Sequence, residues 1–196
     1  MTKNIHHNHI DAFLDSFNSR ARIEHSYVLD MGCGDAYATK IFAERGASVI
    51  HAHDPYATPS LLHPTAEFFP NYSELPHKYD IIWLHHVLEH IEDCFDFLRM
   101  LHARLTDSGL LWMAVPNMAQ HSVYSPGHIH NFQAAQLIEV LRRCGYAVGD
   151  ISTWVHHGQL RVRVPARGNC QYPRPMATSL EVTGRCPSTA FTTWNW

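Results

Sequence analysis

The chain has 196 residues, of which 45% are hydrophobic and 17% charged, and its formal net charge is -3 with histidine neutral. This length suits one domain with a full apolar core, and the composition excludes a disordered chain. The small negative charge excludes a global basic field that attracts nucleic acid or an anionic membrane. The five cysteines are odd in number and form no CxxC pair. This pattern argues against a disulfide framework and a structural zinc site, and indicates a reducing cytoplasm.

The N-terminal segment, residues 1–22, is predicted to form a helix that covers the domain. Apolar side chains recur there at helical spacing, at Ile10, Phe13, Leu14 and Phe17. We therefore expect an amphipathic helix over about residues 9–20. No run in the sequence resembles a signal peptide or a membrane span, so we expect a cytoplasmic protein with no membrane partner.

The next part of the chain predicts a β-turn-α-β unit. A strand at 27–29 stops at Asp30 and a glycine-rich turn, a helix follows at 38–46, and a second strand at 47–52 ends near Asp54. Such units pair their strands in parallel, with the helix crossing one face of the sheet.

Further strands and helices alternate up to residue 164. In chain order we expect a short helix at 60–63, a short strand at 67–69, a strand at 80–84, a helix at 87–105, a turn at 107–109, a strand at 110–115, a helix at 133–144, and strands at 146–151 and 160–164. The last two strands have no helix between them and predict an antiparallel hairpin. Residues 165–196 form a tail rich in proline and threonine. The fold class is therefore α/β, a Rossmann-like, seven-stranded, mostly parallel sheet with an antiparallel final strand and helices on both faces.

Ligand binding is expected at the turn Gly32-Cys33-Gly34. Glycine lets the backbone bend tightly and come close to a ligand, and the amide groups of the turn and the following helix favour an anionic group. Asp54 lies 20 residues after Gly34, where an acidic residue of a Rossmann-type unit accepts hydrogen bonds from ribose hydroxyls. The structural alternatives are an ordinary glycine turn and a capping role for Asp54.

Several segments in this order carry a resemblance to a known family. They are Val28–Gly34, His53–Pro55, Tyr79–Ile91, Gly109–Asn117 and the trailing Gly127–Phe132. Together they resemble the class I S-adenosylmethionine-dependent methyltransferases, and more narrowly the branch with the ubiquinone-biosynthesis O-methyltransferases and related small-molecule enzymes. The resemblance covers roughly residues 27–164, and it implies S-adenosylmethionine as the cofactor.

The resemblance also implies roles for individual residues. The turn after the first strand would line the methionine and ribose end of the cofactor, Asp54 would bind the ribose, and one of residues 71–73 would lie near the adenine. The implied cofactor-binding residues are Asp30, Gly32, Cys33, Gly34, Asp54, Tyr72, Leu84 and His85. The family often has a third glycine where this sequence has Ala36.

Methyl transfer displaces a neutral leaving group, so it needs alignment and sometimes a base, but no acid. Substrate-facing loops of open α/β sheets lie at the carboxyl ends of the strands. The candidate catalytic residues are His85, His128 and His130, with His86 and His90 as further histidines of the same loops. Each of them has an equally good structural explanation.

The acceptor is predicted to be a small molecule, because the chain lacks a basic stripe and an appended recognition domain. A protein or nucleic-acid substrate stays open as the alternative. No sequence feature separates an oxygen, nitrogen or carbon nucleophile, and none indicates an oligomeric state.

A zinc hydrolase is one competing hypothesis, because residues 86–90 fit the HxxEH pattern. On a helix, His86 and His90 would share a face and bind zinc, with Glu89 as general base. The third ligand would have to be Glu139 or Glu181, neither of which lies in a supporting motif.

Two further hypotheses keep the fold but change the function. A nicotinamide-dependent dehydrogenase is disfavoured, because Tyr37 stands where GxGxxG has its last glycine or alanine. A non-catalytic binding module is disfavoured, because Asp30, Gly32, Gly34 and Asp54 are all present.

Overall fold

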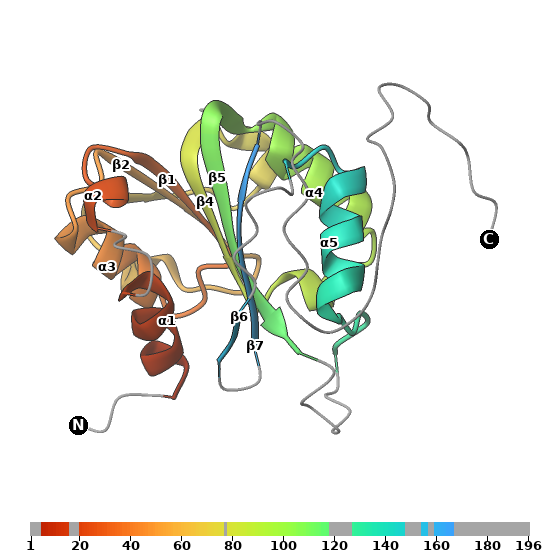
Figure 1. The fold of residues 1–196 in the computed structure, drawn as a ribbon. Coiled ribbons are helices and arrows are strands. Elements are labelled where there is room, and N and C mark those ends of the chain that lie inside the picture. The colour runs from red at the N-terminus through yellow and green to blue at the C-terminus, as the bar shows by residue number, and fades with distance from the viewer. Residues whose placement is uncertain are drawn as a thin grey trace.

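Seven strands form one sheet at the centre of the molecule (Figure 1). The computed structural model describes residues 5–15, 20–76, 78–117, 127–147, 154–156 and 159–166. The strands are β1 (Tyr27–Met31), β2 (Val49–His53), β3 (Ala66–Phe68), β4 (Tyr79–His85), β5 (Leu105–Pro116), β6 (Trp154–His156) and β7 (Gln159–Pro165). Their order is β3-β2-β1-β4-β5-β7-β6. Neighbours among β1 to β5 are parallel, and β7 pairs antiparallel with β5 and β6. The predicted mostly parallel sheet with an antiparallel end is confirmed.

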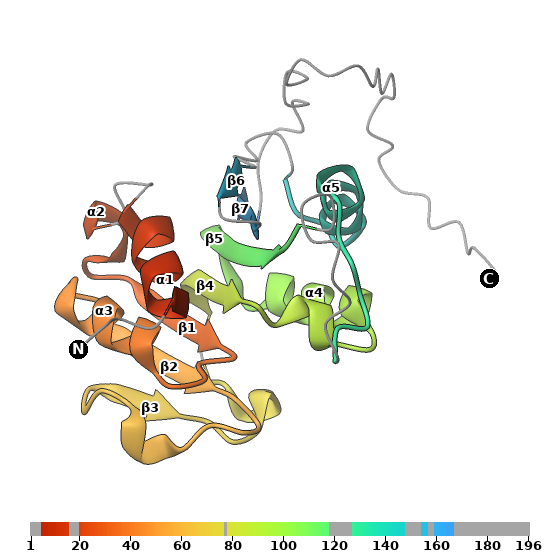
Figure 2. The ribbon, with the colours of Figure 1, turned by 90° about the horizontal axis from the view of Figure 1, so that it is seen from below.

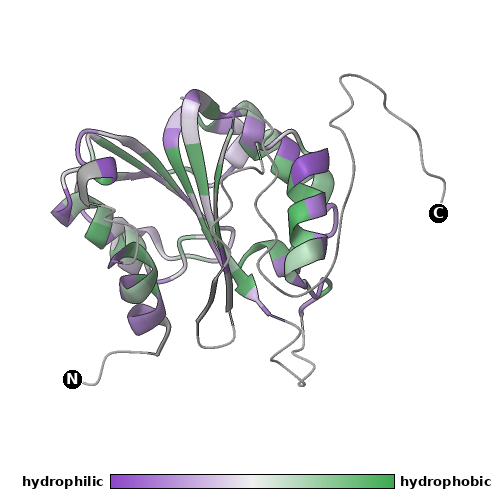
Figure 3. Ribbon diagram, in the orientation of Figure 1, coloured by the Kyte–Doolittle hydropathy of each residue, from purple (hydrophilic) through white to green (hydrophobic). Residues whose placement is uncertain are grey.

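The α-helices cover both faces of this sheet, as predicted (Figures 1 and 2). One face carries α1 (Ile5–Asp15), α2 (Arg20–Ile23) and α3 (Tyr37–Glu44), and the other carries α4 (Cys94–Ala103) and α5 (Ala134–Arg143). Short 3-10 helices η1 (Pro59–Leu61), η2 (Tyr72–Glu74) and η3 (Leu88–His90) follow strands or connect them. Figure 3 shows apolar residues concentrated along the central strands and on the inward sides of the helices. Both faces of a parallel sheet must be covered, which explains the near-continuous apolar strands.

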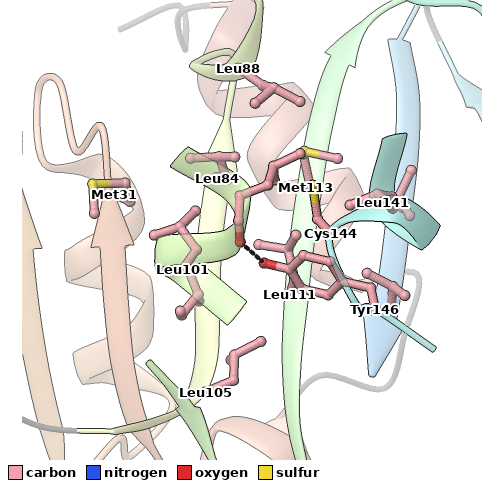
Figure 4. Close-up of a cluster of buried hydrophobic side chains, with 14 of the residues drawn as sticks. Met31, Leu84, Leu88, Leu101, Leu105, Leu111, Met113, Leu141, Cys144 and Tyr146 are labelled. Carbon is pink, nitrogen blue, oxygen red and sulfur yellow. Dashed lines mark hydrogen bonds between the residues drawn. The ribbon is translucent and has the colours of Figure 1, made fainter. Parts of the chain in front are cut away.

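Each face of the sheet has its own apolar core. On the first face, Phe13 of α1 and Phe42 of α3 are fully buried against Trp83 of β4, with ring centroids 4.8 and 5.9 Å from the indole. On the second face, leucines of α4 and α5 pack on β4 and β5, and Tyr146 donates a hydrogen bond to the Leu98 carbonyl oxygen at 3.0 Å (Figure 4). The two cores fix the sheet between the helical layers.

The direction of the strand order reverses between β1 and β4. From β1 the chain proceeds through β2 to β3 on one side, and from β4 to β5 on the other. In open α/β sheets ligands bind outside the carboxyl ends of the strands at the point where this direction reverses. The loops after β1 and β4 therefore border the expected ligand position.

Three local predictions were wrong. The helix expected over residues 87–105 is split into η3 and α4, because Asp93 ends the connection and caps α4 by accepting a hydrogen bond from the Asp96 amide. The turn expected at 107–109 lies inside β5, where the pairing with β4 shifts register between Tyr79 and Ile81. Tyr146 and Ala147 are not in a strand, whereas β6 occupies residues 154–156.

Some predictions fall outside the described residues. These are the end of the N-terminal helix at 16–19, the strand residues 148–151 and the tail beyond residue 166. Within the described part of the chain, no helix combines the length and apolar character needed to cross a bilayer.

Candidate functional site

The turn after β1 is tied to the end of β2. The Gly32 and Cys33 amides both donate to the His53 carbonyl oxygen, at 2.7 and 3.2 Å. Gly32 has φ +83°, and a Cβ built on it lies 2.2 Å from Val87 Cγ2 in the loop after β4. Gly32 is therefore required by the backbone and by packing, and its predicted place beside the cofactor stays a prediction. Gly34 has φ +51°, and no atom of the described residues lies within 4 Å of a Cβ built on it.

Asp54 joins the turn to the loop after β2. Its Oδ2 accepts a hydrogen bond from the Gly34 amide at 2.9 Å, and its Oδ1 accepts one from the Tyr56 amide at 2.7 Å. Each carboxylate oxygen has a second lone pair, so both remain able to accept from the hydroxyls of a ligand. The predicted meeting of the glycine turn and the carboxylate is present in the structure.

Asp30, the fourth residue of β1, brings a buried carboxyl group to the same place. Its side chain is 1% exposed, and its Oδ2 has no hydrogen-bond partner among the described residues. Burial, with the negative charges of Asp54 and Asp35, raises the pKa of Asp30 to about 8. A buried carboxylate oxygen without a partner favours a cation, such as an ammonium group, at this position.

The other implied cofactor residues divide into two groups. Tyr72 in η2 is half exposed and meets His53 edge to face, with centroids 5.7 Å apart, so it stands at the same edge of the sheet as Asp54. Cys33 is buried, and burial raises the pKa of its thiol, which keeps it neutral. Leu84 is fully buried, and its side chain lies in the core beside Met113 rather than facing the crevice (Figure 4).

Histidines follow β4 directly. His85 is half-buried and stacks on Trp83, with ring centroids 5.6 Å apart and an interplanar angle of 2°. His86 has φ +57°, a left-handed conformation that is strained for a residue with a Cβ. Its Nδ1 lies 2.9 Å from Oε1 of Glu89, a carboxylate with no exposed surface. A carboxylate accepts only, so Nδ1 carries the proton and the lone pair of the neutral ring is on Nε2.

The segment after residue 126 lies on the same loop. The Ile129 and His130 amides donate to the Glu89 carbonyl oxygen at 2.9 and 3.1 Å. His130 Nε2 lies 3.2 Å from the Glu92 carbonyl oxygen, whereas the ring of His128 meets that of His90 with centroids 4.8 Å apart. The structure thus brings His85 and His128 to neighbouring loops, and it gives the His130 ring a backbone partner.

The N-terminal helix reaches the glycine turn. His7 Nε2 lies 2.6 Å from Asp35 Oδ2, and the His7 ring stacks on Tyr37 with centroids 3.8 Å apart. The Tyr37 hydroxyl in turn donates to Asp11. Sequence reasoning missed these contacts, although polar residues just after the turn, Asp35 and Tyr37, gave a signal for a partner there.

Comparison with known sequences decides the class. Residues 5–150 match the family described as a methyltransferase domain. The chain belongs to the methyltransferase domain family. No curated protein matches the sequence. The class predicted from the sequence is confirmed, while the narrower likeness to the ubiquinone-biosynthesis branch stays a prediction.

Solved structures share the fold of this methyltransferase. The 1,6-didemethyltoxoflavin-N1-methyltransferase of Burkholderia thailandensis, with bound 1,6-didemethyltoxoflavin and S-adenosylhomocysteine, has 19% identity and a TM-score of 0.65 over 84% of this chain and 79% of its own. The magnesium protoporphyrin IX methyltransferase of Synechocystis PCC 6803, with bound S-adenosylhomocysteine, has 16% identity and a TM-score of 0.61 over 82% and 83%. An S-adenosylmethionine-dependent methyltransferase from Mesorhizobium loti has 12% identity and a TM-score of 0.61 over 79% and 96%. These likenesses concern the fold.

The zinc-hydrolase hypothesis does not match the geometry of the methyltransferase. Residues 88–90 form a 3-10 helix, and His86 precedes it in a left-handed conformation. His86 and His90 therefore do not share the face of an α-helix, and Nδ1 of His86 is bonded to the proposed general base, Glu89.

Proposed function

We propose that this methyltransferase binds S-adenosylmethionine at the carboxyl ends of β1 and β2 and transfers its methyl group to a small molecule. The observation that carries the proposal is the hydrogen bond from the Gly34 amide to Asp54, which brings the turn and the carboxylate to one place. Asp54 would accept from the ribose hydroxyls, and Tyr72, whose ring meets that of His53, would stack on the adenine ring.

The residues at the other end of this crevice fit the rest of the cofactor. Asp30 offers a buried carboxylate oxygen without a partner, which suits the ammonium group of a methionine moiety. Among the residues that the structure describes, no atom lies within 4 Å of a Cβ built on Gly34, which leaves room for a ligand there. When bound, S-adenosylmethionine supplies an activated methyl group on a sulfonium, whose neutral leaving group needs no acid.

An acceptor that loses a proton needs a base, and His86 has the most suitable arrangement among the histidines near β4. The buried carboxylate of Glu89 holds Nδ1 of His86 at 2.9 Å and leaves the lone pair on Nε2. His85, His128 and His130 remain candidates from the sequence. A hydrogen bond to a buried carboxylate orients an imidazole and stabilises the imidazolium that forms on proton transfer.

A small acceptor agrees with the net charge of -3, which supplies no attraction for nucleic acid. Two of the structurally similar enzymes are named after small compounds, 1,6-didemethyltoxoflavin and magnesium protoporphyrin IX.

The test is to follow release of S-adenosylhomocysteine by the full chain over a panel of small hydroxyl, amine and carbon acids. We expect turnover with members of one chemical class. Turnover only with a peptide or RNA would overturn the small-molecule assignment, and a folded protein without any affinity for S-adenosylhomocysteine would overturn the whole proposal.

A further inference from the structure

Three side chains that commonly bind metals meet beside the end of β4. One ligand atom from each of Glu89, His90 and His128 lies within 4.8 Å of the other two. The two imidazoles pack edge to face, and the Ile129 and His130 amides fix the second segment to the Glu89 carbonyl oxygen. The group therefore joins η3 to the segment after residue 126 through backbone bonds as well as side chains.

The carboxylate of Glu89 has an unmet requirement. Glu89 is 0% exposed, and its Oε1 accepts a hydrogen bond from His86. Its Oε2 has no hydrogen-bond partner among the described residues. A buried carboxylate oxygen is costly unless a donor or a cation faces it. Since His90 and His128 are the neighbouring ligands, a metal ion between the three groups meets this requirement.

The hydrogen bond of the His90 ring suits a metal ligand. Its Nδ1 lies 2.9 Å from the Gly127 carbonyl oxygen. A carbonyl only accepts, so Nδ1 carries the proton and the Nε2 lone pair is the one left for a metal. Metal-binding histidines almost always donate their other ring nitrogen in this way, and metal-binding carboxylates are themselves hydrogen-bonded, as Glu89 is by His86.

We propose that Glu89, His90 and His128 bind one divalent transition-metal ion of the zinc type. Two imidazole nitrogens and one carboxylate oxygen form the ligand set of open zinc sites, and they also suit cobalt and manganese. Bonds from the metal to its ligand atoms are about 2.0–2.2 Å long. Any two ligand atoms that lie as far apart as 4.8 Å must therefore approach each other by roughly 1 Å when the ion binds. This set differs from the HxxEH hypothesis, because Glu89 is a ligand and His86 lies behind it as its hydrogen-bond donor.

The site also has a place in the proposed reaction, a role that rests on the proposed function. Val87, two residues before Glu89, packs against Gly32 of the turn after β1. An ion here with open coordination positions would bind an oxygen of the acceptor and make its proton more acidic. Metal binding itself does not depend on methyl transfer, so the two proposals fail separately.

The test is equilibrium dialysis of the full chain against Zn²⁺ alone and Co²⁺ alone, with the visible Co²⁺ spectrum as a second readout. We expect one ion per chain, and at least about tenfold weaker binding in His90→Ala, His128→Ala and Glu89→Gln. Since Glu89 is buried, circular dichroism checks each fold, and the exposed His90 provides a variant that leaves the core intact.

Two controls separate this site from the other histidines of the chain. His25→Asn removes a histidine whose side chain is 86% exposed and should leave binding unchanged. Replacement of His6 and His9 by Gln removes two of the three histidines in residues 6–9 and should also leave metal binding unchanged. Loss of the bound ion in either control with retention in His90→Ala and His128→Ala, or absence of stoichiometric binding in the wild type, would overturn the proposal.

Discussion

At the scale of single residues, the two glycines of the turn after β1 have different tasks. Gly32→Ala combines a φ of +83° with a contact of 2.2 Å to Val87, so we expect the free energy of unfolding to fall by about 2–4 kcal/mol. In Gly34→Ala the added methyl group meets no atom of the described residues within 4 Å, so this variant should cost about 1–2 kcal/mol, from the backbone alone.

Cofactor affinity separates the same two variants. The methyl group of Gly34→Ala would extend into the space that the proposed function assigns to the cofactor, so binding of S-adenosylhomocysteine should weaken roughly tenfold or more, equal to about 1.4 kcal/mol. Urea denaturation and calorimetry on both variants check this division. Equal losses of stability in the two variants would show that the Val87 contact is unimportant.

The buried carboxyl group of Asp30 predicts a dependence of stability on pH. Its pKa is raised to about 8 in the folded chain and is about 3.9 in an unfolded one, so between these values the folded state holds the extra proton. The free energy of unfolding should therefore fall as pH rises from about 4 through 8, and then level. Asp30→Asn should remove this part of the slope, whereas the exposed neighbour variant Asp35→Asn, which removes only the smallest of the three causes of the raised pKa, should keep most of it. Urea denaturation at pH 5.5, 7 and 8.5 checks the prediction, and an unaltered slope in Asp30→Asn would refute it.

At the scale of elements, α1 is a part of the core as well as a cover for the turn. Phe13 has no exposed surface, packs on Trp83, and has the buried Arg161 guanidinium 5.4 Å above its ring. Arg161 also donates to the His9 carbonyl oxygen at 3.0 Å and so links α1 to β7.

Truncation of the Phe13 side chain should therefore destabilise the fold strongly. We expect Phe13→Ala to lower the free energy of unfolding by about 3–5 kcal/mol, and the exposed Asn8→Ala on the same helix to change it by less than about 0.5 kcal/mol. Thermal and urea unfolding measure both. A small effect in Phe13→Ala would mean that α1 is only loosely attached and acts purely as a cover.

Local patterns were sufficient for most elements, because buried strands and amphipathic helices have distinct apolar periods. They failed where a tertiary contact decides the outcome. The cap at Asp93 interrupts a helical pattern that continues on both sides, and the shift in β5 inserts polar residues that resemble a turn. Ala36 adopts φ 62° as the N-cap of α3, a left-handed conformation that glycine adopts without strain.

At the scale of the whole molecule, sequence spacing predicted the meeting of the glycine turn and Asp54, since both follow parallel neighbouring strands. The burial and the contacts of individual side chains could not be predicted in this way. Nothing in the pattern distinguished Leu84, which points into the core, from His85 beside it. The bond between His86 and Glu89 and the pairing of His90 with His128 depend on a left-handed residue and on two loops far apart in the chain.

The central claim is that Asp54 and the turn after β1 bind one nucleoside. Calorimetric titration of S-adenosylhomocysteine into the wild type and Asp54→Ala tests it most directly, with Asp107→Ala as a matched loss of an exposed carboxylate in the early part of β5. We predict one site per wild-type chain, unchanged affinity in Asp107→Ala, and a loss of about 1.5–3 kcal/mol in Asp54→Ala from the missing hydrogen bonds. Unchanged affinity in a folded Asp54→Ala would contradict the account.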